Sequence, residues 1–235
     1  MVHQSHGKIF LASERGHTET EVFRSYNTFK FGNYQNENKI PFASLYLLND
    51  DTLAGGQSLK LFIEEDSEIL LLPFVGAIRY KDSLGNSSLI QAGQVQMTFL
   101  KKGATFEIAN PYEKQLVNFF QFWFKSSVAS SINRIIPFEI DKNKSSLFEL
   151  PLHVQNTSPK SLKFSLGKFM GREEVVYKSL DKKRSAFVFV LQGAFEVQYR
   201  LLEARDGLAL WNTEEIEIEA LSNEAIIMLI EMNLE

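Results

Sequence analysis

An internal repeat limits the folds that this chain can adopt. In each copy an apolar run is followed by a Gly-Ala pair and then by a run of alternating apolar and polar residues that ends near a tyrosine. The first copy is Pro73–Tyr80 and the second is Val190–Tyr199. The two pairs, at Gly76 and Gly193, are separated by about half of the chain. Self-similarity over that distance predicts two copies of one β unit.

The other apolar runs also favour an all-β protein. They are short, rich in aromatic and β-branched residues, and separated by Gly, Asn, Asp and Ser, as in antiparallel sandwiches and barrels. In Glu215–Ala220 two isoleucines and an alanine alternate with three carboxylates, the period of a half-buried strand. Lys81–Asn86 lies between two such runs and predicts a hairpin. Helix is scarce, and we expect a short one only over Ser126–Ile135.

Composition excludes several classes of function. The formal charge is −4, with 25 basic and 29 acidic residues, which argues against a surface that binds nucleic acid. The one dense basic run, Lys182 to Arg184, is interpreted as a solvated turn. The absence of cysteine removes disulfides, thiolate metal sites and cysteine nucleophiles. No stretch predicts a signal peptide or a membrane span, so we expect a cytoplasmic protein without a membrane partner.

Five short motifs follow one another along the chain. They are Glu14–His17, Phe29–Tyr34, Lys81–Asn86, Gln121–Phe124, and Asp206–Trp211 followed by Ile216 and Ile218. In their order and spacing they resemble the pirin family of cupins. The C-terminal motif resembles the second domain of bacterial pirin-like proteins that include quercetin dioxygenases. The resemblance covers nearly the whole chain.

The resemblance implies an all-β bicupin with little helix, built from two antiparallel double-stranded β-helix (jelly-roll) barrels. We expect an N-terminal cupin domain over residues 1–125, a linker region over 126–159 and a C-terminal cupin-like domain over 160–235. Strands from the N-terminal segment are expected to pair with the C-terminal domain. Where the family has a metal site, it lies in the N-terminal barrel.

The family's metal ligands are two alternating histidines from a first motif, then a histidine and a glutamate from a second. Counting back from the predicted hairpin without gaps places the first two positions on Phe62 and Glu64. Anchoring the second motif on its flanking glycine and asparagine places the other two on Phe106 and Ile108. Alternate residues of a strand point the same way, so such a pair of strands can offer four ligands to one interior point.

Three of these four former ligand positions hold residues that cannot coordinate a metal. Phenylalanine and isoleucine have no lone pair, so Glu64 is the only donor left, whereas stable sites use three or four ligands. We therefore expect no metal and no cofactor, and no metal-dependent dioxygen chemistry. The four histidines, His3, His6, His17 and His153, are expected at the surface.

Two interpretations of these positions stay open. The acidic segment Glu64–Glu68 is either a solvated rim, or it directs Glu64 into the former cavity, where a carboxylate needs a partner or a raised pKa and becomes a weak candidate for a catalytic acid or base. Phe62 and Phe106 either fill the core or form flat apolar walls for a small aromatic ligand.

These observations predict a metal-free, non-catalytic pirin-like bicupin that serves as a small-molecule-binding or protein-interaction module. The alternative is a pirin-like enzyme acting on an aromatic small molecule, either of the quercetin 2,3-dioxygenase type with a relocated metal or with Glu64 as a metal-free acid or base. A third possibility, transcriptional co-regulation through a protein partner, is implied only by the family's eukaryotic members.

Overall fold

In the computed structural model the described residues are 5–30, 40–126, 132–139, 146–152, 162–178 and 184–233. They form β-strands and a single turn of 3-10 helix, η1 (Ala12–Glu14). The chain divides into an N-terminal unit, Arg15–Phe138, and a C-terminal unit, Met1–Glu14 with Glu139–Glu235. The described part of the chain has no helix that is both long enough and apolar enough to cross a bilayer.

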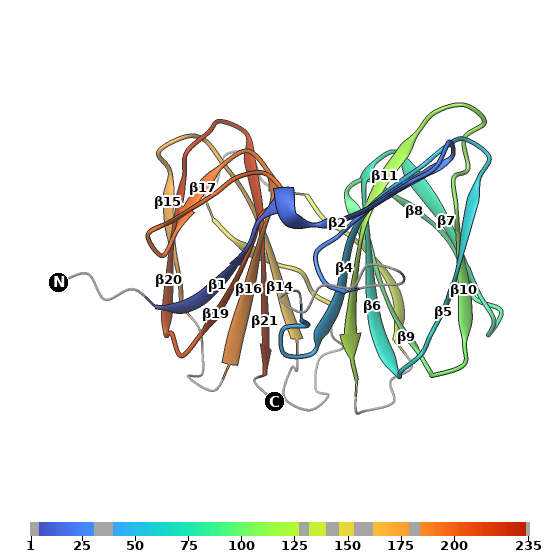
Figure 1. Cartoon of the computed structure of the whole chain (residues 1–235), viewed down its shortest axis with the longest axis horizontal. Helices are drawn as coiled ribbons and strands as arrows, with labels where there is room; N and C mark the ends of the chain where they lie inside the picture. Colours follow the sequence, from blue (N-terminus) through green and yellow to red (C-terminus); the bar gives the residue numbers. More distant parts are fainter. Residues whose placement is uncertain are drawn as a thin grey trace. The chain divides into compact units, whose positions relative to one another are not determined.

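The N-terminal unit consists of two antiparallel sheets (Figure 1). In spatial order, the seven-stranded sheet contains β12 (Asn133–Pro137), β9 (Gln94–Leu100), β6 (Ser67–Val75), β11 (Val117–Lys125), β4 (Leu45–Leu53), β3 (Phe23–Asn27) and β2 (Gly16–Glu19). The four-stranded sheet contains β5 (Ser58–Phe62), β10 (Thr105–Ala109), β7 (Ala77–Asp82) and β8 (Ser87–Gln91).

The C-terminal unit repeats this plan. Its six-stranded sheet contains β1 (His6–Phe10), β19 (Gly207–Trp211), β16 (Arg184–Gln192), β21 (Ala225–Asn233), β14 (Leu162–Phe169) and β13 (Phe148–Glu149). Its four-stranded sheet contains β15 (Glu174–Lys178), β20 (Glu215–Ala220), β17 (Phe195–Val197) and β18 (Arg200–Leu202). The N-terminal segment thus contributes β1, which pairs with β19.

The Gly-Ala repeat marks the same step in both units. Gly76 joins β6 to β7, and Gly193 joins β16 to β17, so each glycine carries the chain from the larger sheet to the smaller one. Their φ angles are +81° and +79°, a region that glycine adopts without the steric penalty of a Cβ atom. The predicted all-β architecture with two copies of one unit is confirmed.

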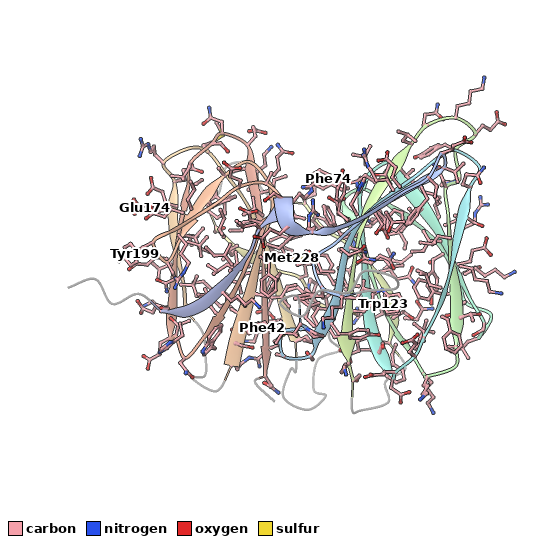
Figure 2. The ribbon with its side chains drawn as sticks, viewed as in Figure 1. Phe42, Phe74, Trp123, Glu174, Tyr199 and Met228 are labelled. Atoms are coloured by element: carbon pink, nitrogen blue, oxygen red, sulfur yellow. The ribbon has the colours of Figure 1, made fainter. Side chains whose placement is uncertain are left out.

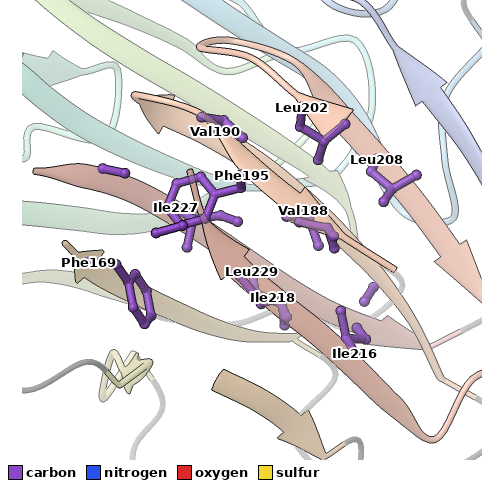
Figure 3. Packing of buried hydrophobic residues seen from close by; sticks show 14 of the residues in the cluster. Phe169, Val188, Val190, Phe195, Leu202, Leu208, Ile216, Ile218, Ile227 and Leu229 are labelled. Carbon is purple, nitrogen blue, oxygen red and sulfur yellow. The ribbon is translucent and has the colours of Figure 1, made fainter. Parts of the chain in front are cut away.

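Each unit buries an apolar core between its two sheets. Figure 3 shows the core of the C-terminal unit, where Ile216 and Ile218 of β20 pack with Val188 and Leu229 of the other sheet. The predicted alternation of β20 is confirmed, because Ile216, Ile218 and Ala220 are buried while Glu215 and Glu217 are exposed. Such two-layer packing explains why the strands alternate apolar and polar residues.

Two local predictions have different outcomes. The hairpin at Lys81–Asn86 is confirmed, since it links β7 to β8 and Asp82 Oδ1 accepts hydrogen bonds from the backbone amides of Leu84 and Asn86. The predicted helix over Ser126–Ile135 is wrong at its C-terminal end, because Asn133–Ile135 belong to β12 and pair with β9. Residues 127–131 lie outside the described residues.

Candidate functional site

The interior of the N-terminal unit is the place where the family resemblance predicts a former metal centre. Strands β5 and β10 form its relevant wall, with Leu61 directly opposite Phe106 and Leu59 directly opposite Ile108. Residues directly opposite each other in an antiparallel pair lie on the same face of the sheet. Phe106 and Ile108 are buried in the core, so Leu59 and Leu61 share the inner face with them.

The predicted orientation of Phe62 and Glu64 is therefore wrong by one residue. Phe62 lies opposite Thr105, and its side chain is 56% exposed. Glu64 follows β5 in a bend and is exposed, whereas Ile63 before it is fully buried in the core. The physical reason is that cross-strand pairing with β10 sets the facing of β5, and a shift of one residue turns every side chain to the opposite face.

Because Glu64 is exposed, it is not an acid or base directed into the barrel. Of the two interpretations of the acidic segment, the solvated rim holds for Glu64, Glu65 and Asp66, because all three are exposed. Glu65 pairs with Lys125 at 2.9 Å. Glu68, in contrast, is buried on β6.

Aromatic rings fill the space beside the inner-facing positions. The Phe106 ring centroid lies 5.7 Å from that of Tyr80 and 5.5 Å from that of Trp123, which Figure 2 labels in the N-terminal unit. The Tyr80 hydroxyl donates to Asp82 Oδ2 at 2.9 Å. The Trp123 indole N–H donates to Gln121 Oε1 at 3.1 Å. Phe106 therefore belongs to a packed core, while Phe62 belongs to the surface.

The inner-facing residues of β10, of the end of β5 and of the position after it do not fit a metal ion. Leu61, Ile63, Phe106 and Ile108 offer no nitrogen, oxygen or sulfur donor, whereas a stable protein site needs three or four. Across the described ranges, no three or more His, Asp and Glu side chains gather in a way that could hold an ion.

The two histidines that lie within the described residues have surface partners. His6 stacks on Trp211, with ring centroids 6.4 Å apart. His17 stacks on Tyr26 at 4.7 Å and pairs with Glu19 at 3.3 Å. His3 and His153 lie outside the described residues.

A buried polar network, which the sequence pattern did not predict, lies elsewhere on the inner face of the seven-stranded sheet. Asn49 and Asp51 alternate on β4 with the core residues Leu47 and Leu53, so they share the face that points inward. Gln121 Nε2 donates to Asp51 Oδ2 at 2.6 Å. The members of the network are Ser25, Asn27, Asn49, Asp51 and Gln121, all buried.

A second set of bonds ties the network to β3. The Asn27 side-chain amide donates to Asn49 Oδ1 at 2.9 Å and to Ser25 Oγ at 3.1 Å. Ser25 lies directly opposite Asp51. The signal in the sequence is the polar triplet Asn49 to Asp51, which interrupts an otherwise apolar strand.

Asp51 is the most strongly perturbed carboxyl group of this network. Burial raises its pKa from 3.8 to about 7, because the charged form loses its hydration. Hydrogen bonds from Ser25 and Gln121 oppose this rise, and the neighbouring charge of Asp50 adds to it. The carboxyl group therefore titrates near neutral pH inside the N-terminal unit.

The outer faces of the two four-stranded sheets carry different charge patterns. In the C-terminal unit Glu219 lies directly opposite Glu174 on one side and Glu196 on the other, and we call these three residues the acidic row. In the N-terminal unit, Glu107 of the corresponding strand β10 lies instead between Lys60 and Lys81. Like charges directly opposite each other destabilise a sheet, so the fold itself does not require the acidic row.

A surface groove of about 340 Å³ overlies the acidic row. Its lining also includes Val176, Glu217 and Tyr199, and Figure 2 labels Glu174 and Tyr199 on this side of the C-terminal unit. Two effects of Glu217 raise the pKa of Tyr199. The larger is a hydrogen bond between the two side chains, and the smaller is the negative charge of Glu217. Arg172 supplies a counter-charge to Glu219 at 3.5 Å.

Comparison with known proteins places both units in one family. The model of the family described as "Pirin" matches residues 11–124, and the model described as "Quercetinase C-terminal cupin domain" matches residues 160–232. The quercetin 2,3-dioxygenase of Escherichia coli (strain K12) is 25% identical over 220 residues, which cover 92% of this chain and 95% of the relative.

Solved structures show the same fold. The crystal structure of YhhW from Escherichia coli superposes with a TM-score of 0.84 at 23% identity and covers 98% of this chain and 99% of YhhW. The structure described as bacterial pirin YhhW in complex with nickel(II) superposes with a TM-score of 0.83 at 22% identity. The match covers 98% of this chain and 100% of that one. Two adjoining family models and a shared fold over nearly the whole length lead to one conclusion, that this chain belongs to the pirin family.

Proposed function

We propose that this chain is a non-catalytic member of the pirin family that acts as a small-molecule-binding or protein-interaction module and does not carry out metal-dependent dioxygenation. The observation that supports this is the apolar character of the inner-facing positions on β5 and β10. Fold and activity are separable, because activity depends on the residues of the site.

The donor set is the basis of this proposal. A relative whose structure is described with nickel(II) has the same fold at 22% identity, so the scaffold itself is compatible with a metal in the family. In this chain the facing pair Leu61 and Phe106 offers a branched alkane and a benzene ring instead of two ligands. Asp51 contributes a carboxyl group to the interior, but one carboxylate does not make a transition-metal site.

Metal content and turnover test the proposal together. The full chain, purified without chelators and then incubated with Ni(II), Fe(II) or Cu(II), is expected to retain far less than one equivalent after desalting. It is also expected to leave quercetin unconsumed. Near-stoichiometric metal in the N-terminal unit, or metal-dependent loss of quercetin, would overturn the proposal.

A gain-of-ligand variant sharpens the test. Leu61→His combined with Phe106→His places two imidazoles directly opposite each other on the inner face, and is expected to raise Ni(II) affinity. Phe62→His combined with Phe106→His is the matched control, because position 62 points to the solvent and cannot share an ion with position 106. Equal Ni(II) binding by the two variants would show that the assigned facing of β5 is wrong.

A further inference from the structure

The outer faces of the two four-stranded sheets carry opposite charges at one matching position. Arg79 and Glu196 each lie three residues after the glycine of the internal repeat, so their positions are equivalent. Both side chains are exposed, and each lies directly opposite an exposed leucine, Leu89 for Arg79 and Leu201 for Glu196. Two copies of one sheet therefore present a leucine beside a cation in one unit and beside an anion in the other.

The acidic row of the C-terminal unit lies at the surface groove of about 340 Å³. Four of the nine residues that line the groove are glutamates, and no described lysine or arginine lines it. Val176 and Tyr199 add apolar surface to the lining, because 48% of each residue is exposed. Such a groove is complementary to a partner that brings positive charge together with an apolar side chain.

The basic run of the sequence is not the matching surface in the described part of the chain. Its interpretation as a solvated turn is wrong for Arg184, because this side chain is only 10% exposed and pairs with Glu231. Lys182 and Lys183 lie outside the described residues.

The outer face of the N-terminal four-stranded sheet has the matching character. Lys60 and Lys81 lie on either side of Glu107, and both lysines are exposed. Arg79 precedes Lys81 by two residues on β7 and is a third exposed cation on this face. Phe62 follows Lys60 by two residues on β5 and is 56% exposed, so its ring lies on the same face. We call Lys60, Phe62, Arg79 and Lys81 the basic face.

We propose that the basic face of one copy of this chain docks on the acidic row of a second copy. The Phe62 ring enters the groove and packs against Val176 and Tyr199, while Lys60 and Lys81 lie beside the glutamates of the row. Complementary charges orient a contact of this kind, and a buried aromatic anchor supplies much of its free energy. The proposal does not rest on the proposed function, because neither face includes the interior of the N-terminal unit.

The small size of the two sheets limits the strength of the contact. Strands lie about 4.8 Å apart and rise about 3.3 Å per residue, so a face of four short strands buries a total area below about 1,200 Å². We therefore expect weak and reversible association that salt screens. Because the two faces differ, the contact is heterologous, and each bound copy still presents one face of each kind to further copies.

Sedimentation velocity of the full chain over a range of protein concentrations tests the proposal. At low ionic strength we expect the weight-average sedimentation coefficient to rise with concentration, and in about 0.5 M salt we expect that rise to disappear. Phe62→Ala should weaken association at least ten-fold without unfolding the protein, because the ring is exposed. Leu116→Ala is the matched control, because Leu116 is 60% exposed but lies outside both sheet faces, and association should stay within two-fold.

An exchange of charges between the two faces is the sharper test. Lys60→Glu with Lys81→Glu turns the basic face into a second acidic row. Glu174→Lys with Glu196→Lys gives the acidic row the Lys-Glu-Lys order of the basic face. Each double variant alone should lose association, and an equimolar mixture of the two should regain it. The two variants change the net charge in opposite directions, so net charge alone does not explain both losses.

The proposal is overturned if the sedimentation of the parent chain does not depend on concentration at low ionic strength, including the case in which a lysine-rich peptide saturates the groove instead. It is also overturned if Phe62→Ala associates like the parent, or if the mixture of double variants stays monomeric. If Lys60→Glu with Lys81→Glu does not fold, Arg79→Glu replaces it, with the same loss expected. Metal content and quercetin turnover do not enter these measurements, so the two proposals can fail separately.

Discussion

Replacing Asp51 by asparagine is expected to flatten the pH dependence of folding stability. The carboxyl group is fully buried, and its pKa rises from 3.8 to about 7 on folding. Between these two values the unfolded chain has lost the proton and the folded protein keeps it. Because the folded state then binds more protons, the free energy of unfolding decreases as pH rises, by about 1.4 kcal/mol per pH unit.

The full effect follows from the width of that window. A shift of about three pH units corresponds to about 4 kcal/mol. Above pH 7 the buried Asp51 lowers the free energy of unfolding by this amount, whereas below its unfolded pKa it does not lower it. Asparagine has nearly the same shape and does not titrate. The difference in stability between Asp51→Asn and the parent should therefore increase by about 2 kcal/mol from pH 5 to pH 7, in favour of the variant.

Urea denaturation at intervals between pH 5 and pH 8 measures this difference directly, because each curve gives a free energy of unfolding. Ser25→Ala is a useful second variant, since the Ser25 hydrogen bond lowers the pKa of Asp51 and its loss should move the decline to higher pH. Parallel pH profiles for Asp51→Asn and the parent would refute the reasoning, because they would mean that Asp51 titrates alike in the folded and unfolded chains.

Three further predictions test the core, the surface charges and the repeat. Phe106→Ala should lower the free energy of unfolding by about 3 to 5 kcal/mol and Phe62→Ala by about 0.5 kcal/mol or less, measured in urea, since only the first opens a cavity. Glu219→Lys should stabilise the protein by about 0.5 to 1 kcal/mol because it interrupts the acidic row, whereas Glu107→Lys should destabilise it. Shifts of the melting temperature in the same direction for both variants would contradict this. Gly193→Ala should lower the melting temperature, because φ is +79° and the added Cβ atom would clash with Ser222 Oγ; an unchanged melt would show that the turn relaxes.

Part of the candidate site could be predicted from the sequence, and there is a specific physical reason why the rest could not. Phe106 and Ile108 lie on the inner face as expected, because they alternate on one short strand. Phe62 and Glu64 were not, because their positions were counted across the bend that follows β5. Alternation predicts facing only within a strand, and it carries no information through a bend or bulge.

The sequence by itself determined the class of the molecule and its division into two similar halves. Strand periodicity, the glycines at 76 and 193 and the turn at Lys81–Asn86 are local properties, set by side-chain spacing and by the backbone conformations that each residue tolerates.

The tertiary structure alone decided which side chains meet. Asp51 and Gln121 are 70 positions apart, and Lys163 and Glu231 are 68 apart, yet each pair shares one interior because β4 lies beside β11 and β14 beside β21. Burial and pairing between distant strands set the pKa of Asp51 and the exposed fraction of the Glu231 side chain. Neither quantity is encoded in any short stretch of chain, because both depend on what the rest of the fold removes from water.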